Sequence, residues 1–252
     1  MNAGARTGLE EAEQDVKLFR RRNPALGLLC TLLALGGSSA ITYALMTAPT
    51  PPPQPTAAQA GTLPPLETRH TPAPTAAPQP EMPASLPTHV RIPSIGVDAA
   101  VDTLGLNSDG TVQVPSEPAD AGWYRGSAAP GQIGAAVLLG HVDFAASGPA
   151  VFYRLGELAP GAAVLVARKD GSTAAFTVVA VREFPKSGFP TEQVYGPTDG
   201  DAQLRLVTCG NWDSDQHKYV GNTVVFATLD PPPSAEPPAP RAARAGDARG
   251  PR

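Results

Sequence analysis

The sequence has few aromatic residues, few charges and very little cysteine. Aromatic side chains make up 6% of the 252 residues and charged side chains 17%, against 30 prolines and 25 glycines. So many chain breakers and so few large core residues exclude a chain that folds along its whole length. Aromatic and β-branched residues gather between about Val90 and Leu229. This predicts one folded domain of roughly 140 residues, which is enough to bury its own core.

A strong excess of charge is also missing. The formal net charge is −4, and no basic stripe with interleaved aromatic residues is present, so we expect no nucleic-acid partner. The His, Cys and Asp residues do not have the spacing of a zinc site. We therefore expect no metal and no cofactor.

Charge is absent altogether from Asn23 to Leu66. Within that stretch, residues 25–48 are rich in Leu and Ala and are long enough to cross a hydrocarbon core of about 30 Å. A buried soluble helix would show a polar face, and this stretch has none. We therefore expect one transmembrane anchor at residues 25–48.

The basic residues around this stretch predict its direction. Lys17 and Arg20–Arg22 precede it, and the next positive residue is Arg69. Positive charge stays on the cytoplasmic side of a membrane, so residues 1–24 are expected in the cytoplasm. We then expect a single-pass protein of the cell membrane whose folded domain lies outside the cell. A cleaved signal peptide is the alternative.

Three further regions follow the expected anchor. Residues 49–86 are rich in Pro and Ala, a composition that predicts a semi-rigid spacer or stalk. Residues 87–231 carry the expected domain. Residues 232–252 return to Pro and Ala with scattered Arg, which predicts a disordered tail.

The pattern inside the domain is mainly that of β-structure. Short apolar and β-branched runs such as AAVLVAR, AAFTVVAVREF and NTVVFATL are divided by turns at Pro130–Gly131, Pro160–Gly161 and Asp170–Gly171. Close spacing of such runs indicates an all-β barrel or sandwich. Helical periodicity is weak and supports only short helices, around residues 150–155 and 191–194.

The two cysteines are separated by the expected membrane. Cys30 lies in the expected span, so Cys209 is the one cysteine expected outside the cell. A solitary cysteine in a secreted domain indicates a reactive thiol, an intermolecular bridge or an inert buried side chain. Cys209 ends the apolar run LRLVT and is followed by the polar loop GNWDSDQHK. That position, where a strand leaves the core, favours a reactive thiol.

A histidine has a comparable position. His141 lies in the run AAVLLGHV, just after its apolar part, and alternation places it on one face with Val137 and Leu139. A thiolate nucleophile and an imidazole that protonates the leaving amine are the two groups that cysteine transfer chemistry needs. Cys209 and His141 are therefore the candidate catalytic pair. Among the other histidines, His217 is a candidate for the rim of the site.

Several motifs resemble the sortase family, and among its members the class F enzymes of actinobacteria. They lie in the family's order and cover essentially the whole expected domain. The matching pieces are RIPSIGVDAAV at 91–101, GWYRGSAAPGQIGAAVLLGHVDF at 122–144, AVFYRL at 150–155, LVTCG at 206–210 and NTVVFA at 222–227. An LxTC motif with an upstream GH at a strand end is a specific combination.

The resemblance implies a fold and a reaction. The fold is a closed eight-stranded sortase-type β-barrel with few short helices, here preceded by one transmembrane helix. By this resemblance Cys209 is the nucleophile, His141 the catalytic histidine, and Thr208 a residue lining the substrate groove. The implied reaction cleaves an LPxTG-like sorting signal between Thr and Gly and holds the new carboxyl end as a thioester on Cys209. The implied acceptor is the amine of a peptidoglycan precursor or of another cell-wall component.

The sequence departs from the family at one position. Sortases carry an arginine in or just before the last strand, where it steadies the substrate and the oxyanion. That position falls on Asn222, or on Val220 if the strand is offset by two residues. Asn222 could act as a neutral donor to the substrate, and Lys218 is a nearby cation. Arg205 lies about 13 Å from Cys209 along its strand, which makes it a poor substitute.

Two other functions compete with an active sortase. One is a degenerate protein of the sortase fold that binds sorting signals or wall polymers without catalysis, favoured by the missing arginine. The other is a different extracytoplasmic cysteine enzyme, such as an L,D-transpeptidase or a papain-like wall hydrolase. Those families place Cys and His in other local motifs.

Overall fold

The computed structural model describes residues 51–64 and 81–231. The expected cytoplasmic segment, transmembrane anchor and C-terminal tail lie outside the described residues, as do parts of the expected stalk. Within the two described ranges, no helix is long and apolar enough to cross a membrane.

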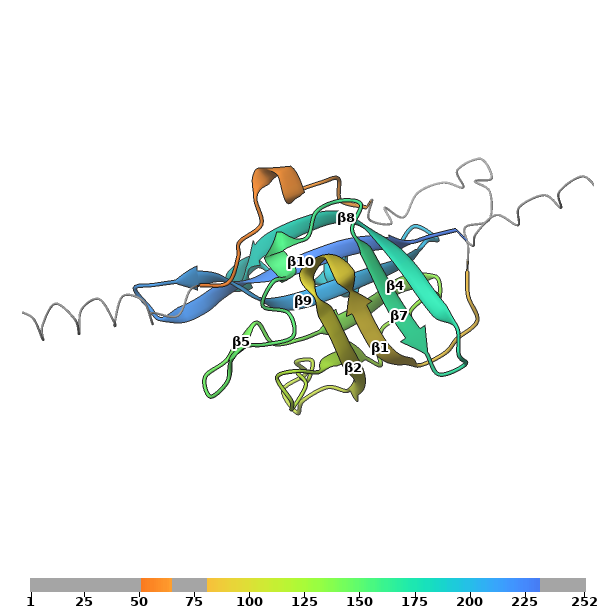
Figure 1. The fold of residues 1–252 in the computed structure, drawn as a ribbon, viewed down its shortest axis with the longest axis horizontal. Coiled ribbons are helices and arrows are strands. Elements are labelled where there is room, and N and C mark those ends of the chain that lie inside the picture. The colour runs from red at the N-terminus through yellow and green to blue at the C-terminus, as the bar shows by residue number, and fades with distance from the viewer. Residues whose placement is uncertain (1–50, 65–80, 232–252) are drawn as a thin grey trace, which may run out of the picture. The chain divides into compact units, whose positions relative to one another are not determined.

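Eight strands close into a barrel, in the order β1-β2-β3-β4-β9-β10-β8-β7 (Figure 1). The strands are β1 (Pro87–Ile92), β2 (Val97–Leu104), β3 (Ala121–Tyr124), β4 (Gly134–Leu139), β7 (Ala163–Arg168), β8 (Thr173–Pro185), β9 (Ala202–Asp213) and β10 (Lys218–Leu229). A separate two-stranded hairpin is formed by β5 (Asp143–Phe144) and β6 (Gly148–Pro149). The predicted all-β fold with a closed eight-stranded barrel is confirmed.

Helical structure among the described residues is short, as the weak helical periodicity predicts. The one α-helix there is α3 (Thr191–Tyr195), at the place expected for residues 191–194. The other expected helix is a set of turns that ends in the 3-10 helix η3 (Leu155–Glu157). Further 3-10 turns are η1 (Ala57–Gln59), η2 (Pro93–Ile95) and η4 (Lys186–Gly188).

Two neighbouring pairs in the barrel are parallel, β2 with β3 and β4 with β9. The remaining pairs are antiparallel. The β4–β9 pair matters for function because parallel strands run toward the same end of the barrel, and β9 continues beyond the end of β4. Its last partners are Leu139 and Val207, so the residues that follow them leave the barrel at the same end.

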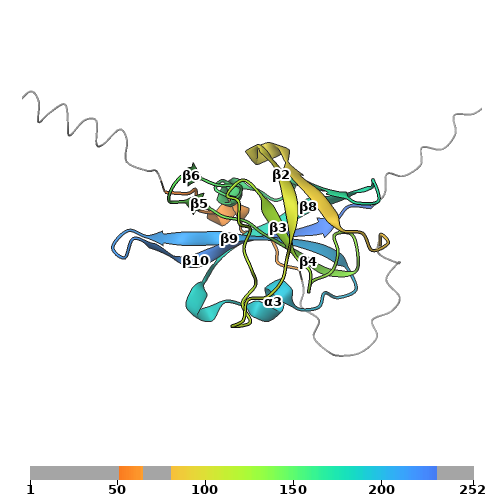
Figure 2. The same ribbon diagram turned by 90° about the horizontal axis from the view of Figure 1, so that it is seen from below.

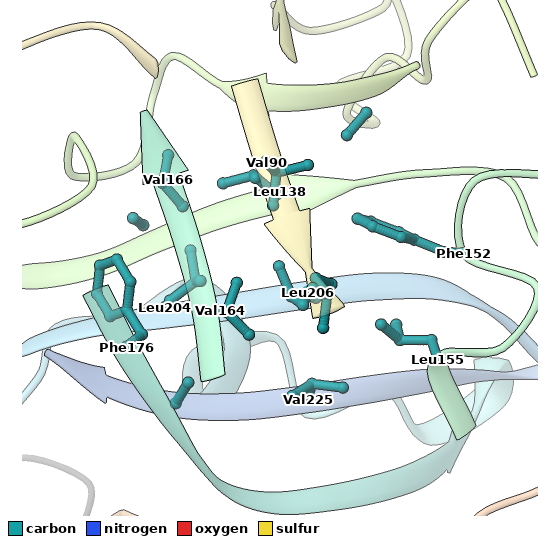
Figure 3. Packing of buried hydrophobic residues seen from close by; sticks show 14 of the residues in the cluster. Val90, Leu138, Phe152, Leu155, Val164, Val166, Phe176, Leu204, Leu206 and Val225 are labelled. Atoms are coloured by element: carbon teal, nitrogen blue, oxygen red, sulfur yellow. The ribbon is translucent and has the colours of Figure 1, made fainter. Parts of the chain in front are cut away.

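The interior of the barrel is filled by alternate residues of its strands. Figure 3 shows part of this inner core, including Val90, Leu138, Phe152, Phe176 and Leu206, and these five side chains are fully buried. Alternation places every second residue inside. Each such burial stabilises the fold by about 1.5–3 kcal/mol. The inner core therefore fixes the register on which the site depends.

A second apolar cluster covers the opposite face of β4, β9 and β10. It contains Val137, Val207 and Phe226, which alternate with inner-core residues, and Val194 from α3. Figure 2 shows α3 beside the barrel. We call this surface the outer face. It is apolar near α3, and the strands continue beyond it toward the solvent.

Part of the expected stalk lies against the barrel. Beyond Val178, β8 has β10 as its only partner strand, and residues 51–64 run past this edge, in orange in Figure 1. Gln59 Nε2 donates to the carbonyl oxygens of Gly156 and Leu158 at 2.7 and 2.9 Å, and Arg182 Nη2 donates to Gly61 O at 2.9 Å. Residue 61 must be glycine because its φ is +53° and a Cβ would lie 1.9 Å from the carbonyl oxygen of β8 residue 179. The segment covers a strand edge that would otherwise be open to pairing.

Candidate active site

Cys209 lies where β9 leaves the barrel. Residues 202–208 of β9 are all buried, Cys209 is half-buried, and Asn211 is exposed. The thiol is free. Alternation places its side chain on the outer face, in line with Val207 of the outer cluster. The buried part of the strand holds the thiol, while its own position remains open to a substrate.

His141 lies level with Cys209, just beyond the end of the neighbouring strand β4. The last β4–β9 pair joins Leu139 to Val207, and Gly140 N donates to Val207 O at 3.1 Å. His141 follows Leu139 by two residues, as Cys209 follows Val207. The parallel register therefore carries both residues to the same end of the barrel and, by alternation, to the same face.

Two contacts orient the half-buried imidazole. Nε2 of His141 lies 2.9 Å from the carbonyl oxygen of Pro115, and the ring meets Phe144 edge-to-face with centroids 5.6 Å apart. A carbonyl oxygen only accepts hydrogen bonds, so Nε2 carries the proton in this geometry. This leaves Nδ1 as the nitrogen that can accept a proton.

Asn222 faces Cys209 from the other side. It is the direct antiparallel partner of Cys209 in the β9–β10 pair, and it is half-buried. Cross-strand partners project from the same face of a sheet. The structure therefore brings three of the four predicted site residues, His141, Cys209 and Asn222, into one row across neighbouring strands.

Thr208 is the predicted site residue that falls outside this row. It precedes Cys209, so alternation turns its side chain to the inner side of the barrel, where it is only 4% exposed. Its cross-strand partner is Thr223, and its buried Oγ1 has no hydrogen-bond partner among the described residues. A role in substrate binding stays a prediction for Thr208.

A cation that the sequence analysis missed lies at the thiol. Nζ of Lys186 is 3.9 Å from Sγ of Cys209. Lys186 begins η4, immediately after β8. Nothing in the sequence near Lys186 signals this contact, because it depends on the register between β8, β10 and β9.

The two cations weighed from the sequence have other surroundings. Lys218 is the cross-strand partner of Asp213, near the tip of the β9–β10 hairpin. Arg205 is buried, with its guanidinium 4.6 Å above the Phe226 ring and Nη2 donating to Gln203 Oε1. Burial without a carboxylate partner lowers the pKa of Arg205 to about 10.

A second missed contact ties the hairpin to the segment after His141. The hydroxyl of Tyr219 on β10 donates to Oδ2 of Asp143 on β5. Burial, followed by this bond and the charge of Asp143, raises the pKa of Tyr219 well above its usual value. The phenol therefore stays protonated and acts as a donor. This bond joins the segment two residues after His141 to the strand that pairs with the Cys209 strand.

A cavity lies beside the segment that follows His141 in the chain. This cavity of about 570 Å³ is lined by residues that include Ile95, Ala99, Pro118, Val151 and Arg154. It borders the segment that hydrogen-bonds to the His141 backbone, since Phe152 N donates to His141 O at 3.0 Å. Cys209 and His141 do not line this cavity. The candidate site is therefore a row on the strands rather than this hollow.

Comparison with known proteins gives the class of this chain. The model of the sortase domain family matches residues 90–230, which is more than half of the chain and nearly all of the barrel. The chain belongs to the sortase family. No curated protein matches the chain.

Solved structures of sortases show likeness at low identity. Sortase A from Corynebacterium diphtheriae, as a lid mutant, is 20% identical, with 59% of this chain and 72% of that chain covered and a TM-score of 0.46. Sortase C2 from Pilus Island 1 of Group B Streptococcus is 22% identical, with 57% and 73% covered and a TM-score of 0.43. A Clostridium perfringens sortase D5 transpeptidase is 18% identical, with 57% and 79% covered and a TM-score of 0.43.

Proposed function

We propose that this protein is a membrane-anchored, extracytoplasmic sortase that uses Cys209 as nucleophile and His141 as acid and base. It cleaves an LPxTG-like sorting signal and transfers the cleaved protein to a cell-wall amine. The observation that carries the proposal is the parallel β4–β9 register, which brings His141 and Cys209 level at one end of the barrel. Thiol and imidazole at one site are the groups that acyl transfer through a thioester requires.

The reaction proceeds in two halves on these residues. The thiolate of Cys209 attacks the carbonyl carbon of the signal's threonine, and the C–N bond to glycine breaks while His141 donates a proton to the leaving amine. The acceptor amine then attacks the thioester carbonyl and gives up a proton to His141. The C–S bond breaks, the new amide is released, and Cys209 returns to the thiolate.

Cell location and subclass belong to the same proposal. The charge-free stretch at residues 25–48 supports the anchor, and Lys17 and Arg20–Arg22 ahead of it support a cytoplasmic N-terminus. The motifs around His141 and Cys209 support membership of class F, with an actinobacterial origin. The natural acceptor is a peptidoglycan precursor or another wall amine.

One observation favours a second candidate, a protein of the sortase fold that binds sorting signals without cleaving them. Asn222 stands opposite Cys209 and brings no positive charge to the thiol. Losing one oxyanion donor costs about 10²–10³ in rate in other enzymes. A binding protein would hold an LPxTG peptide without forming any covalent bond to Cys209.

Intact-mass spectrometry of the full chain in detergent distinguishes the two candidates. With an LPxTG peptide, the expected product is a thioester of the cleaved peptide on Cys209. The chain supplies matched controls, because Cys30→Ala should keep the adduct whereas Cys209→Ala loses it. His141→Gln should slow thioester formation by about 10²–10⁴-fold, and His217→Gln should leave it unchanged. An adduct that persists in a folded Cys209→Ala variant would refute the proposed mechanism.

A further inference from the structure

We infer that Lys186 supplies the positive charge of the catalytic site, which the neutral Asn222 does not. The inference rests on the proposed function and names a further catalytic residue for it. Its starting observation is the 3.9 Å distance between Lys186 Nζ and Cys209 Sγ. That distance is within the limit for a hydrogen bond to sulfur, and a charged donor strengthens such a bond.

The strand register explains why this lysine reaches the thiol. Phe184 of β8 is the partner of Asn222, which in turn is the partner of Cys209. The row formed by His141, Cys209 and Asn222 therefore continues onto β8 at Phe184. Lys186 follows Phe184 by two residues, where the chain turns into η4.

The turn that carries Lys186 is held on both sides. Before it, Pro185 still pairs with Gly221 of β10. After it, Phe189 meets Phe184 edge-to-face with ring centroids 6.2 Å apart, and Phe189 also packs against Tyr195 of α3 at 6.3 Å. These contacts fix the backbone from which the flexible side chain reaches out.

Other cations that face this part of the barrel are engaged elsewhere. Arg182 donates to Gly61 O, and Arg205 lies buried over Phe226. Lys218 is four residues from Asn222 along β10, or about 13 Å. Among the described residues, Lys186 is thus the cation that contacts the thiol of Cys209.

A charge at this place does two things for acyl transfer. An adjacent ammonium favours the reactive thiolate over the thiol. It also lies beside the atom that attacks, so it can stabilise the negative charge that develops on the substrate's carbonyl oxygen. Lys186 keeps its proton throughout, and His141 alone carries out the proton transfers.

The exposure of Lys186 makes the reactivity of Cys209 depend on salt. The lysine is exposed and the thiol half-buried, so salt screens their interaction. The reactivity of Cys209 should therefore fall as ionic strength rises. A variant without the charge should lose this salt dependence.

Alkylation of Cys209 by iodoacetamide, a neutral reagent, tests the inference without any sorting peptide. The full chain with Cys30→Ser is used, so that Cys209 is the one thiol present. In Lys186→Met, alkylation near neutral pH should be about tenfold slower, because the thiolate loses the adjacent positive charge. Lys186→Arg should restore most of the rate, and the matched control Lys218→Met should behave like the parent chain.

Transfer kinetics complete the test. The rate of thioester formation from an LPxTG peptide should fall about 10–10²-fold in Lys186→Met and recover in Lys186→Arg. An unchanged alkylation rate in Lys186→Met, or an equal loss of rate in Lys218→Met, would overturn the inference. Slower alkylation of Lys186→Met, in a protein that forms no thioester even with Lys186 intact, would instead refute the proposed function and leave the charge–thiol contact standing.

Discussion

The β9–β10 hairpin has an inner half that is buried in the barrel and an outer half that is exposed to solvent. In the inner half, from residue 202 to Thr208, every β9 residue is buried, and strands β4 and β8 flank the pair. In the outer half, beyond Cys209, Asn211 and Trp212 are exposed and the two strands pair mainly with each other. Figure 1 shows this half projecting beyond the neighbouring strands. The thiol lies at the junction, where the support of the sheet and access to solvent meet.

Stability in the two halves has different sources. The inner half is held by burial of apolar surface on both faces. A two-stranded ribbon alone is marginally stable in water, so the outer half depends on individual polar contacts. These include the bond from Tyr219 to Asp143 and the bond from Asn211 N to Glu183 Oε1 at 2.8 Å. This difference leads to three predictions.

The largest effect is expected in the inner half. Leu206 is fully buried in the inner core, so Leu206→Ala should lower the free energy of unfolding by about 2–5 kcal/mol through lost burial and a residual cavity. Urea denaturation measures this loss. Leu106→Ala is the matched control, because Leu106 is 50% exposed and should cost less than about 1 kcal/mol. Equal losses in the two variants would contradict the comparison.

An intermediate effect is expected from Tyr219→Phe. This change removes the hydroxyl that binds Asp143 and should cost about 0.5–1.5 kcal/mol. Hydrogen exchange should speed up in the outer half of the hairpin and around β5, but not in the inner half. In a double-mutant cycle, Asp143→Ala should add little to Tyr219→Phe. Full additivity of the two changes would show that the bond does not couple the two segments.

The smallest effect is expected at the tip. Oδ1 of Asp213 accepts hydrogen bonds from the backbone N–H groups of Asp215 and Gln216, each at 2.9 Å, and the bonds from Gln216 lower the pKa of Asp213. A carboxyl group with a lowered pKa orders the turn above its ordinary pKa, and the effect is lost as pH falls through the lowered pKa. Asp213→Ala should therefore speed exchange at these two amides near neutral pH and leave global unfolding unchanged. Equal protection of both amides in the two proteins at neutral pH would contradict this reading.

Much of the inner half could be predicted from the sequence. The apolar run LRLVT and its polar continuation place Cys209 at a strand exit, and the structure confirms that exit. Alternation placed His141 on one face with Val137 and Leu139, and β4 follows that alternation. Counting back from VVFA put the expected arginine position at Asn222 or Val220, and of these two it is Asn222 that lies opposite Cys209.

The remaining parts of the site depend on distances that local patterns do not encode. Lys186 is 23 residues from Cys209 and Asp143 is 76 residues from Tyr219, and both contacts depend on the register of several strands. For Thr208 the signal was present, because alternation within LVTC turns it away from the Cys209 face. The packing of residues 51–64 could not be predicted, because Gln59 binds backbone carbonyl groups that carry no side-chain signature.

The docked segment, residues 51–64, also determines where a pull on the chain ahead of it acts on the barrel. A pull on the chain ahead of residue 51 is not carried directly into β1, because it first meets the contacts of residues 51–64. The first of these is the bond from Asn211 N to Gln54 Oε1 at 3.2 Å, and the two bonds of Gln59 come next. Such a pull therefore acts on the outer hairpin, two residues from Cys209, before it acts on the inner core.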